Sequence, residues 1–322
     1  MTNESGNSNG VKHVVRGNPD DLSGRRLYVR DLCKNYGPKL VLENIDLAVN
    51  SGELCSLVGP SGCGKSTLLR LILGQERPNK ESIILIDGEP AGYPDPSRGI
   101  VFQKYSLYPH LTVLENVMLG KQLSMNMLAR FVQRKAMREE VMYYLSQVRL
   151  SDATRKYPHE LSGGMQQRAA IAQALIMRPK ILLMDEPFGA LDPEVRERAQ
   201  VFLLEMWDKY KMTIFFVTHD LEEAAFVGTR IVVLSQYYVD DRGDSPEVKR
   251  GSRITADYKL QPHAVSTEVK KTADFGEFVE DVRAQFNPMR RRHVMEFNLS
   301  HPDSFQTLSE DEYGARFCAI KQ

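Results

Sequence analysis

The stretch "GPSGCGKSTLLRLILG", from Gly59 to Gly74, joins a glycine-rich loop to an apolar helical run. It matches the pattern G-x-x-x-x-G-K-[ST], in which backbone N–H groups wrap phosphates, the lysine reaches the terminal phosphates and the hydroxyl can bind Mg²⁺. An apolar strand, Leu54 to Val58, precedes the loop. We therefore expect Lys65 and Ser66 to bind nucleotide phosphates and Mg²⁺ at a helix N-terminus; the alternative is a tight turn without a ligand.

Two further apolar runs, "ILLMDEP" (181–187) and "TIFFVTHD" (213–220), end in polar residues. Such runs are typical of buried parallel strands, whose carboxyl ends bind ligands. Because successive strand residues face opposite ways, we expect Asp185 to bind Mg²⁺ through water and Glu186 to orient or deprotonate an attacking water. His219 is expected to contact a γ-phosphate or that water. The alternatives are a chance acidic pair and a structural histidine.

Two more motifs extend this pattern. Gln103 follows the apolar run of "GIVFQKY", where it could sense Mg²⁺ and the attacking water. "LSGGMQQRAAIAQAL" (161–175) places Ser162 and two glycines before a helix, which gives a second anion-binding helix N-terminus. Since Lys65 already serves one nucleotide, the second N-terminus suggests that two chains pair head to tail and that each completes the ATP site of the other.

From about Leu27 to Ser235 the chain resembles the ATPase cassette of ABC transporters. The motifs that carry the resemblance are "GPSGCGKST", the glutamine of "VFQ", "LSGGM", "ILLMDEP", "GALD" and the histidine of "VTHD", in this order. The resemblance implies an α/β fold: a P-loop NTPase cassette with a RecA-like core, an N-terminal antiparallel β subdomain and a helical subdomain. It also implies ATP hydrolysis with Mg²⁺ in a sandwich dimer that holds two ATP molecules.

The resemblance also assigns roles to residues. Glu186 is the expected general base, His219 the switch histidine, and Gln103 the link between Mg²⁺ and the membrane partner, while Lys65 completes the catalytic set. Asp192 is expected to signal between the two sites or to cap the helix before Pro193. The expected metal-binding residues are Ser66, Gln103 and Asp185. The expected nucleotide-binding residues are Tyr36 (stacked on adenine, or else a core tyrosine), Gly59, Pro60, Ser61, Gly62, Cys63, Gly64, Lys65, Ser66, Thr67, Ser162, Gly163, Gly164 and Asp192.

The motifs "YPHLTVLENV", "YPHELSGGMQQR", "MDEPFGALDPEVRE" and "THDLEEAAF" look like those of nitrate/sulfonate/taurine-type importer ATPases. This finer resemblance implies a second, identical or paralogous cassette, two transmembrane permease subunits and a solute-binding receptor, with this chain peripheral on the cytoplasmic face of the inner membrane. Gln173 departs from the arginine usual in related cassettes. The alternatives are the ATPase of an exporter or lipid-transport complex, a non-transport ABC ATPase and a non-catalytic scaffold.

Composition narrows the function classes. The 322 residues include 42 basic and 42 acidic side chains, so no overall basic field favours nucleic-acid binding. No apolar run is long enough to span a bilayer and the N-terminus has no apolar signal core, so we expect another chain to supply the membrane part. The four cysteines form no metal-ligand cluster and are expected to be free thiols in a reducing cytosol.

We expect three regions along the chain: a disordered polar arm (1–25), the cassette (26–240, with a helical subdomain at about 104–176) and a C-terminal extension of unknown role (241–322). The structural signal fades after Ser235, although "FGEFVEDVRAQF" could form a helix. The segment from Gln103 to about Val117 is expected to pass motion to the permease. Its apolar residues form either a docking groove or local packing: Tyr105, Leu107, Tyr108 and Leu111.

Overall fold

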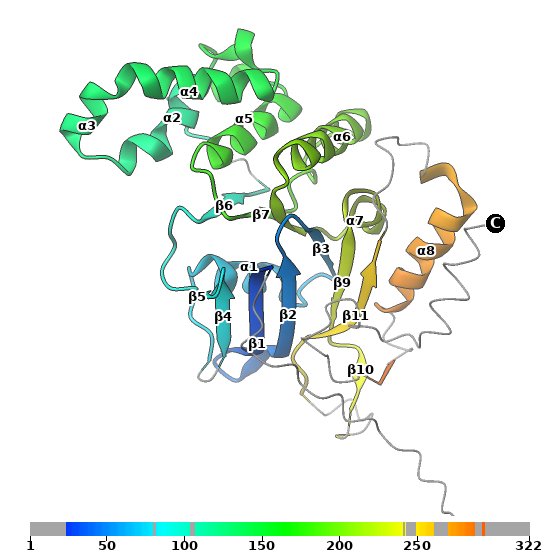
Figure 1. Cartoon of the computed structure of the whole chain (residues 1–322). Helices are drawn as coiled ribbons and strands as arrows, with labels where there is room; N and C mark the ends of the chain where they lie inside the picture. Colours follow the sequence, from blue (N-terminus) through cyan, green and yellow to red (C-terminus); the bar gives the residue numbers. More distant parts are fainter. Residues whose placement is uncertain are drawn as a thin grey trace, which may run out of the picture.

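The computed structural model describes residues 24–79, 82–103, 107–240, 242, 249–260, 270–286 and 292–293. The expected polar arm, Tyr105 and Cys318 therefore lie outside the described residues, apart from the last two residues of the arm. The described chain forms a six-stranded, a four-stranded and a two-stranded sheet, and helices pack beside them, as Figure 1 shows. The expected α/β cassette with an antiparallel β subdomain and a helical subdomain is confirmed.

The central sheet has six strands in the order β11-β9-β3-β8-β7-β6. Its strands are β3 (Leu54–Val58), β6 (Arg98–Val101), β7 (Ile181–Asp185), β8 (Thr213–Val217), β9 (Arg230–Ser235) and β11 (Arg253–Lys259). The first five pair in parallel, and every residue of β3, β8 and β9 is buried. Because both faces of the sheet are covered, these strands read as continuous apolar runs. Their carboxyl ends meet at one edge, where the predicted polar residues follow.

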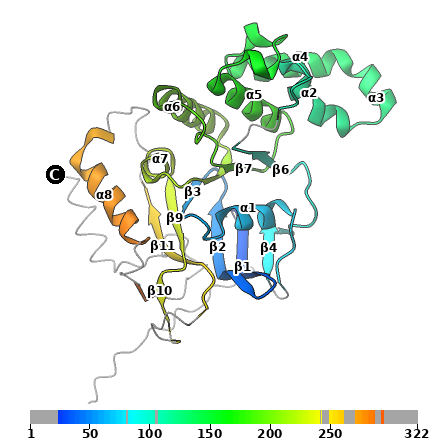
Figure 2. The same cartoon turned by 180° about the vertical axis from the view of Figure 1, so that it is seen from behind.

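A four-stranded antiparallel sheet, in the order β2-β1-β4-β5, covers helix α1 (Lys65–Leu73). Its strands are β1 (Arg25–Tyr36), β2 (Lys39–Asn50), β4 (Ile83–Ile86) and β5 (Glu89–Pro90). Leu68 and Ile72 of α1 share one apolar cluster with Leu27 of β1 and Phe215 of β8. The helix is therefore held between the two sheets, and Figure 2 shows it lying across the antiparallel one. Gly74 ends the helix in a left-handed conformation (φ 80°), which glycine adopts without strain.

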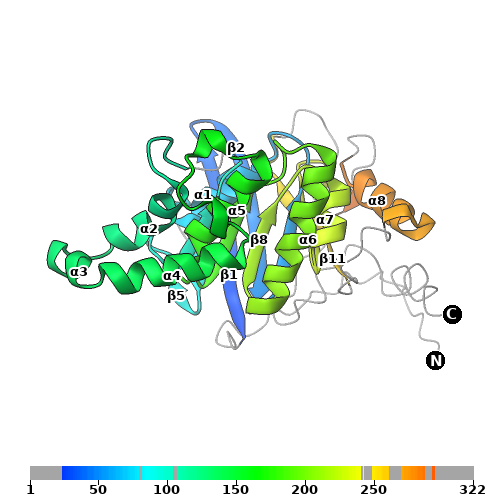
Figure 3. The same cartoon turned by 90° about the horizontal axis from the view of Figure 1, so that it is seen from above.

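The helical subdomain lies beside β6, the edge strand of the central sheet opposite to β11. Its elements are α2 (Val113–Leu123), α3 (Met127–Val132), α4 (Arg134–Gln147), the 3₁₀ turns η1 (Ser151–Ala153) and η2 (Pro158–Glu160), and α5 (Gly163–Leu175). Thr112 begins α2 with a capping box, in which its hydroxyl accepts from Glu115 N–H and the Glu115 carboxylate accepts from Thr112 N–H. Figure 3 shows α2, α3 and α4 extending to one side, with α3 outermost.

The region after Ser235 contains structure that the sequence analysis missed. β11 pairs antiparallel with β9 and forms an edge of the central sheet. The expected boundary at residue 240 thus falls before a strand of the same sheet. Helix α8 (Ala273–Ala284) confirms the helix expected in "FGEFVEDVRAQF", and packs beside α7 (Leu221–Val227). The short strands β10 (Tyr238–Val239) and β12 (Arg292–His293) pair in parallel.

Helix α6 (Pro193–Tyr210) and helix α7 cover the central sheet on the face away from the antiparallel sheet. Leu203 of α6 and Ala224 of α7 are fully buried in one apolar cluster with β3 and β8. None of the helices among the described residues combines the length and apolar character that a membrane crossing needs. Cys33, Cys55 and Cys63 are free thiols, as expected.

Candidate functional site

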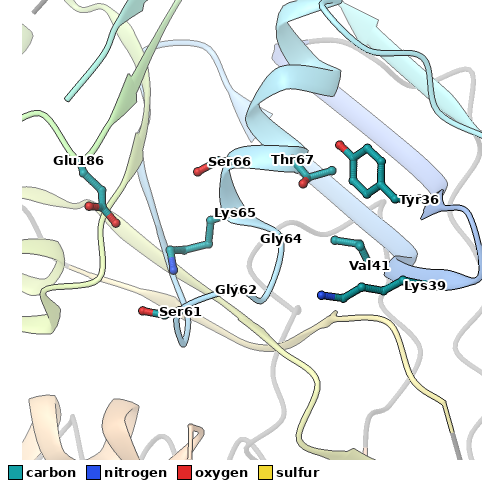
Figure 4. Close-up of a pocket in the computed structure, with 10 residues that line it drawn as sticks. All are labelled: Tyr36, Lys39, Val41, Ser61, Gly62, Gly64, Lys65, Ser66, Thr67 and Glu186. Atoms are coloured by element: carbon teal, nitrogen blue, oxygen red, sulfur yellow. The ribbon is translucent and has the colours of Figure 1, made fainter. Parts of the chain in front are cut away.

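A pocket of about 360 Å³ opens at the start of α1, as Figure 4 shows. This volume lies in the range of small-molecule sites, which is about 300–1,000 Å³. The residues that line it are Tyr36, Lys39, Val41, Ser61, Gly62, Gly64, Lys65, Ser66, Thr67 and Glu186. The structure thus brings seven of the expected nucleotide-binding residues together with Glu186. Gly59, Pro60 and Cys63 belong to the same loop but do not line the pocket.

Two glycines determine the path of the loop at residues 59–67. A Cβ at Gly59 would lie 2.2 Å from the carbonyl oxygen of Leu234 in β9, so the backbones leave no room for a side chain. Gly64 has φ 101° and a Cβ there would lie 2.8 Å from the side chain of Leu42. Only glycine combines this backbone conformation with such close packing. Gly64 precedes α1 without a side-chain cap, so backbone N–H groups of the first turn are left to bind a ligand.

Lys65 is held at the mouth of this loop. Its side chain is buried, with the residue 7% exposed, and its Nζ donates to the carbonyls of Gly59 (2.7 Å) and Pro60 (3.2 Å). A buried ammonium needs such partners, because burial of an unpaired charge is costly. The first turn of α1 has no acidic residue, so the helix dipole and Lys65 together favour an anion at this end of α1.

Asp185, the last residue of β7, faces the start of α1. Burial and the nearby Glu186 raise the pKa of its carboxyl, while a hydrogen bond with the Ser66 hydroxyl and the charge of Lys65 oppose the rise. A cation beside Asp185 and Ser66 would relieve this destabilised carboxylate. The described residues hold no group of three or more His, Cys, Asp or Glu side chains able to form a metal cage. This donor set fits Mg²⁺, which binds through one or two protein ligands together with phosphates and waters.

Glu186 leaves the strand with a left-handed backbone, φ 46°. Its N–H donates to the carbonyl of Val217 at 2.8 Å, which fixes the turn against β8. One carboxylate oxygen accepts from Gln103 Nε2 at 3.4 Å, and the other lies 3.0 Å from His219 Nδ1. The sequence analysis predicted that the side chains of Asp185 and Glu186 face different ways because strand residues alternate. Glu186, however, lies beyond the end of β7, so the left-handed turn also sets the direction of its side chain. A non-glycine residue with positive φ costs energy and is common at functional sites.

The loop that carries His219 is fixed by a buried hydrogen-bond chain, which the sequence analysis missed. Thr218 Oγ1 donates to Glu223 at 2.5 Å, and Gln200 Nε2 donates to the other oxygen of Glu223 at 3.1 Å. Lys270 Nζ then donates to Gln200 Oε1 at 2.8 Å, which joins the region before α8 to the His219 loop. Burial raises the pKa of Glu223, and the bonds from Thr218 and Gln200 oppose the rise. Thr218 lies within the "VTHD" motif and Glu223 follows it closely, but no motif marks Gln200 or Lys270.

The start of α5 lies apart from the pocket. Ser162 is the N-cap, and its hydroxyl accepts from Met165 N–H at 3.4 Å. A Cβ on Gly163 would lie 2.9 Å from Leu191 Cδ2, and one on Gly164 would lie 2.8 Å from Val195 Cγ1. The two glycines therefore let α5 closely approach Leu191, in the loop before α6, and Val195, in the first turn of α6. No residue of 161–165 lines the pocket.

The sequence analysis left two roles open for Asp192 and two for Tyr36. Asp192 occupies the N-cap position of α6 before Pro193, but its side chain makes no capping hydrogen bond. Tyr36 is 42% exposed and lines the pocket, so it is not a core tyrosine. Its hydroxyl donates to Glu76, and Lys34 Nζ lies 5.2 Å from the centre of its ring.

Lys39 and Val41 were not predicted, yet both line the pocket from β2. Figure 4 shows them on the same side as Tyr36, across the loop from Glu186. Their position shortly after Tyr36, at the start of a predicted strand, is the sequence feature that could have indicated them. In the structure this strand packs on Gly64.

Comparison with known proteins identifies relatives of the part of the chain that contains these motifs. A family model described as "ABC transporter" matches residues 42–189. The nitrate import ATP-binding protein of Synechocystis sp. is 45% identical over 199 residues, which is 62% of this chain and 72% of that protein. The sulfate/thiosulfate import ATP-binding protein of Pseudomonas syringae pv. tomato is 43% identical over 222 residues, 68% of each chain. The aliphatic sulfonates import ATP-binding protein of Bacillus cereus is 43% identical over 202 residues, 63% of this chain and 76% of that protein.

Solved structures agree with this likeness. The cbiO1 protein of Clostridium perfringens, described as part of an ABC transporter complex, matches with a TM-score of 0.63 and 27% identity over 81% of this chain and 96% of that chain. A dimeric bacterial ABC transporter cassette, MJ0796, matches with a TM-score of 0.57 and 31% identity over 73% of this chain and 99% of that chain.

Proposed function

This chain belongs to the ABC transporter family, whose ATP-binding domains hydrolyse ATP, and from that premise we propose that two copies of the cassette close head to tail around two ATP molecules. The observation that carries the proposal is the separation of two half-sites in one chain. The start of α1 lines the pocket, whereas the start of α5, with an exposed Ser162, contributes nothing to it. A second chain could bring its α5 start against the phosphates in the pocket.

The residues around the pocket divide the chemistry. Lys65 and the N–H groups of the loop bind the phosphates of ATP, and Tyr36 offers a ring for adenine. Glu186 acts as the general base, held between Gln103 and His219 on either side. Ser66, Asp185 and Gln103 would hold Mg²⁺, which when bound neutralises phosphate charge. Ser162 and Gly164 would meet the γ-phosphate held by the other chain, and Asp192 would carry the signal between the two sites.

The segment from Gln103 to Val117 would transmit the movement to two permease subunits. Asn116 is fully buried and clamps this segment: its Oδ1 accepts from Tyr108 N–H at 2.7 Å, and its Nδ2 donates to the carbonyls of Tyr108 and Leu111. Tyr108 remains 47% exposed and offers a docking side chain, whereas Leu107 packs against the core. The docking alternative is thus favoured for Tyr108 and local packing for Leu107.

The direction and the cargo of transport are proposed from the relatives. Their names describe import of nitrate, sulfate/thiosulfate and aliphatic sulfonates. We assign this chain to an importer of a small anion or organic solute of the nitrate, sulfonate or taurine class. It would lie peripherally on the cytoplasmic face of the inner membrane, with a solute-binding receptor in the full complex. No observation favours an exporter, a lipid-transport complex or a non-transport ATPase over this assignment.

The test is Glu186→Gln. We expect hydrolysis to fall by about 10²–10⁴-fold, since a positioned general base contributes that much, while ATP binding persists. The variant should then accumulate as an ATP-bound dimer, which size-exclusion chromatography with light scattering detects. Asp152→Asn, an exposed carboxylate of η1, serves as the control and should behave as the wild type. Wild-type turnover in Glu186→Gln would sink the general-base assignment, and a variant that stays monomeric with ATP bound would sink the dimer.

A further inference from the structure

The outer end of the helical subdomain exposes an unusual set of apolar side chains. Met127 is 86% exposed and Phe131 is 80% exposed on α3. We define the apolar tip as these two residues together with Leu123, Leu128 and Val132, all of them exposed. Large apolar side chains gathered in one place mark an interaction site. Figures 1 and 3 show α3 as the part of the helical subdomain farthest from the central sheet.

Four basic residues of α3 and α4, close to the apolar tip in the sequence, form a set that we call the basic rim. Arg130, Arg134, Lys135 and Arg138 are exposed, and in the described part of the chain none of the four has an ion-pair partner within 4.0 Å. The sequence explains the charge: residues 116–138 contain five basic residues and no acidic one, in a chain whose formal net charge is zero. The fifth, Lys121, pairs with Glu140. Positive charge is thus concentrated around exposed apolar side chains.

We propose that the apolar tip and its basic rim bind the surface of an anionic lipid bilayer. Apolar side chains flanked by lysine and arginine enter the boundary between headgroups and acyl chains, while the cations contact lipid phosphates. The small size of this set favours lipid over a protein partner. A stable protein interface uses about 20–30 residues a side, whereas the tip and the rim together have five plus four. The contact does not require two cassettes to pair, because the tip lies within one chain.

The test is flotation of the full chain with vesicles of equal parts phosphatidylglycerol and phosphatidylcholine, and with vesicles of phosphatidylcholine alone. We expect binding to the anionic vesicles only, weakened by high salt because the rim contributes through screened charges. Leu128→Ser with Phe131→Ser should reduce the partition at least about tenfold through lost apolar insertion. Arg134→Glu with Lys135→Glu should do the same through charge repulsion.

The matched control is Arg155→Glu with Lys156→Glu, an exposed basic pair elsewhere in the same subdomain that changes the net charge equally. It should bind vesicles as the wild type does, and all three variants should keep the basal ATPase rate. Three results would overturn the proposal: no flotation of the wild type with anionic vesicles, equal flotation with neutral ones, or equal losses in the control. Loss of self-association in Leu128→Ser with Phe131→Ser, without vesicle binding by the wild type, would assign the tip to a second copy instead.

Discussion

Helices α1 and α5 both begin in glycine-rich sequence, but their starts have different surroundings. Gly64, before α1, lies against β2 beside a loop whose Gly59 touches the backbone of β9, and this loop encloses a pocket. Gly163 and Gly164, at the start of α5, lie against side chains of the segment that opens α6, and no pocket residue comes from there. Similar glycine-rich sequence therefore borders a pocket at α1 and packs against the start of α6 at α5. In the proposed dimer these two helix starts would form the α1 half-site and the α5 half-site.

The largest effect should come from breaking the α1 half-site with Lys65→Ala. The variant loses a buried cation that can contact phosphate, and a charge-assisted bond of this kind contributes up to about 3 kcal/mol. We expect ATP binding to weaken about a hundredfold and turnover to vanish, measured by calorimetric titration and phosphate release. Lys39→Ala removes the same charge from β2 in the same pocket and should weaken binding only a few-fold. Equal effects of the two variants would show that Lys65 has no special place.

A smaller effect should follow from closing the α5 half-site with Gly164→Ala. The new Cβ lies 2.8 Å from Val195 Cγ1, so the variant is expected to be less stable and to hydrolyse ATP at least about tenfold more slowly. Binding of ATP to the monomer should not change, because α5 does not line the pocket.

Adding Val195→Ala separates packing from chemistry. The second substitution removes the clash, so thermal unfolding should return toward that of the wild type. Turnover should stay low, because the added methyl group still covers the N-terminus of α5. If turnover recovers with stability, Gly164 matters for packing alone.

Part of the fold and of the site could be predicted from the sequence, because residues close together in the chain determine it. The loop at Gly59–Thr67 and the strands before Asp185 and His219 follow from apolar runs that end in polar residues. β11 could not be found in this way. Its Asp257 is buried, and Arg230 in β9 pairs with it at 2.6 Å. A charged residue in the sequence favours an exposed loop, whereas here the ion pair allows the charge to lie in a buried strand. The partners of Glu223 also come from distant parts of the chain, including Lys270.

An equimolar mixture of the two inactive variants tests whether the two helix starts act in one shared site. A head-to-tail dimer of Lys65→Ala with Gly164→Ala/Val195→Ala has one site with both defects and one intact site. Random pairing makes half of the dimers mixed, so about a quarter of the wild-type turnover should return. Phosphate release from an equimolar mixture measures it, with each variant alone as the control. Turnover that equals only the mean of the two variants alone would exclude shared sites.

The smallest effect concerns Asp185, the partly buried carboxylate that faces the start of α1. The pKa of Asp185 in the folded protein is raised above the ordinary value of 3.8 by burial and by Glu186. The folded state thus binds this proton more tightly than the unfolded chain does, so the linked stability is complete below pH 3.8 and is lost as pH rises through the folded pKa. Asp185→Asn removes the charge, and we expect the metal-free protein to gain about 1 kcal/mol of unfolding free energy at pH 7.

That gain should shrink as the pH falls and should vanish below pH 3.8, where the wild-type carboxyl is protonated in both states. Denaturant unfolding at several pH values measures it. Added Mg²⁺ and ATP should stabilise the wild type more than Asp185→Asn, which lacks the carboxylate that would help hold the metal. Asp192→Asn, an exposed carboxylate close to the start of α5, is the matched control and should change stability by less than about 0.5 kcal/mol at any pH. A gain that grows toward acidic pH would contradict the raised pKa, and equal shifts in both variants would remove this difference between the two helix starts.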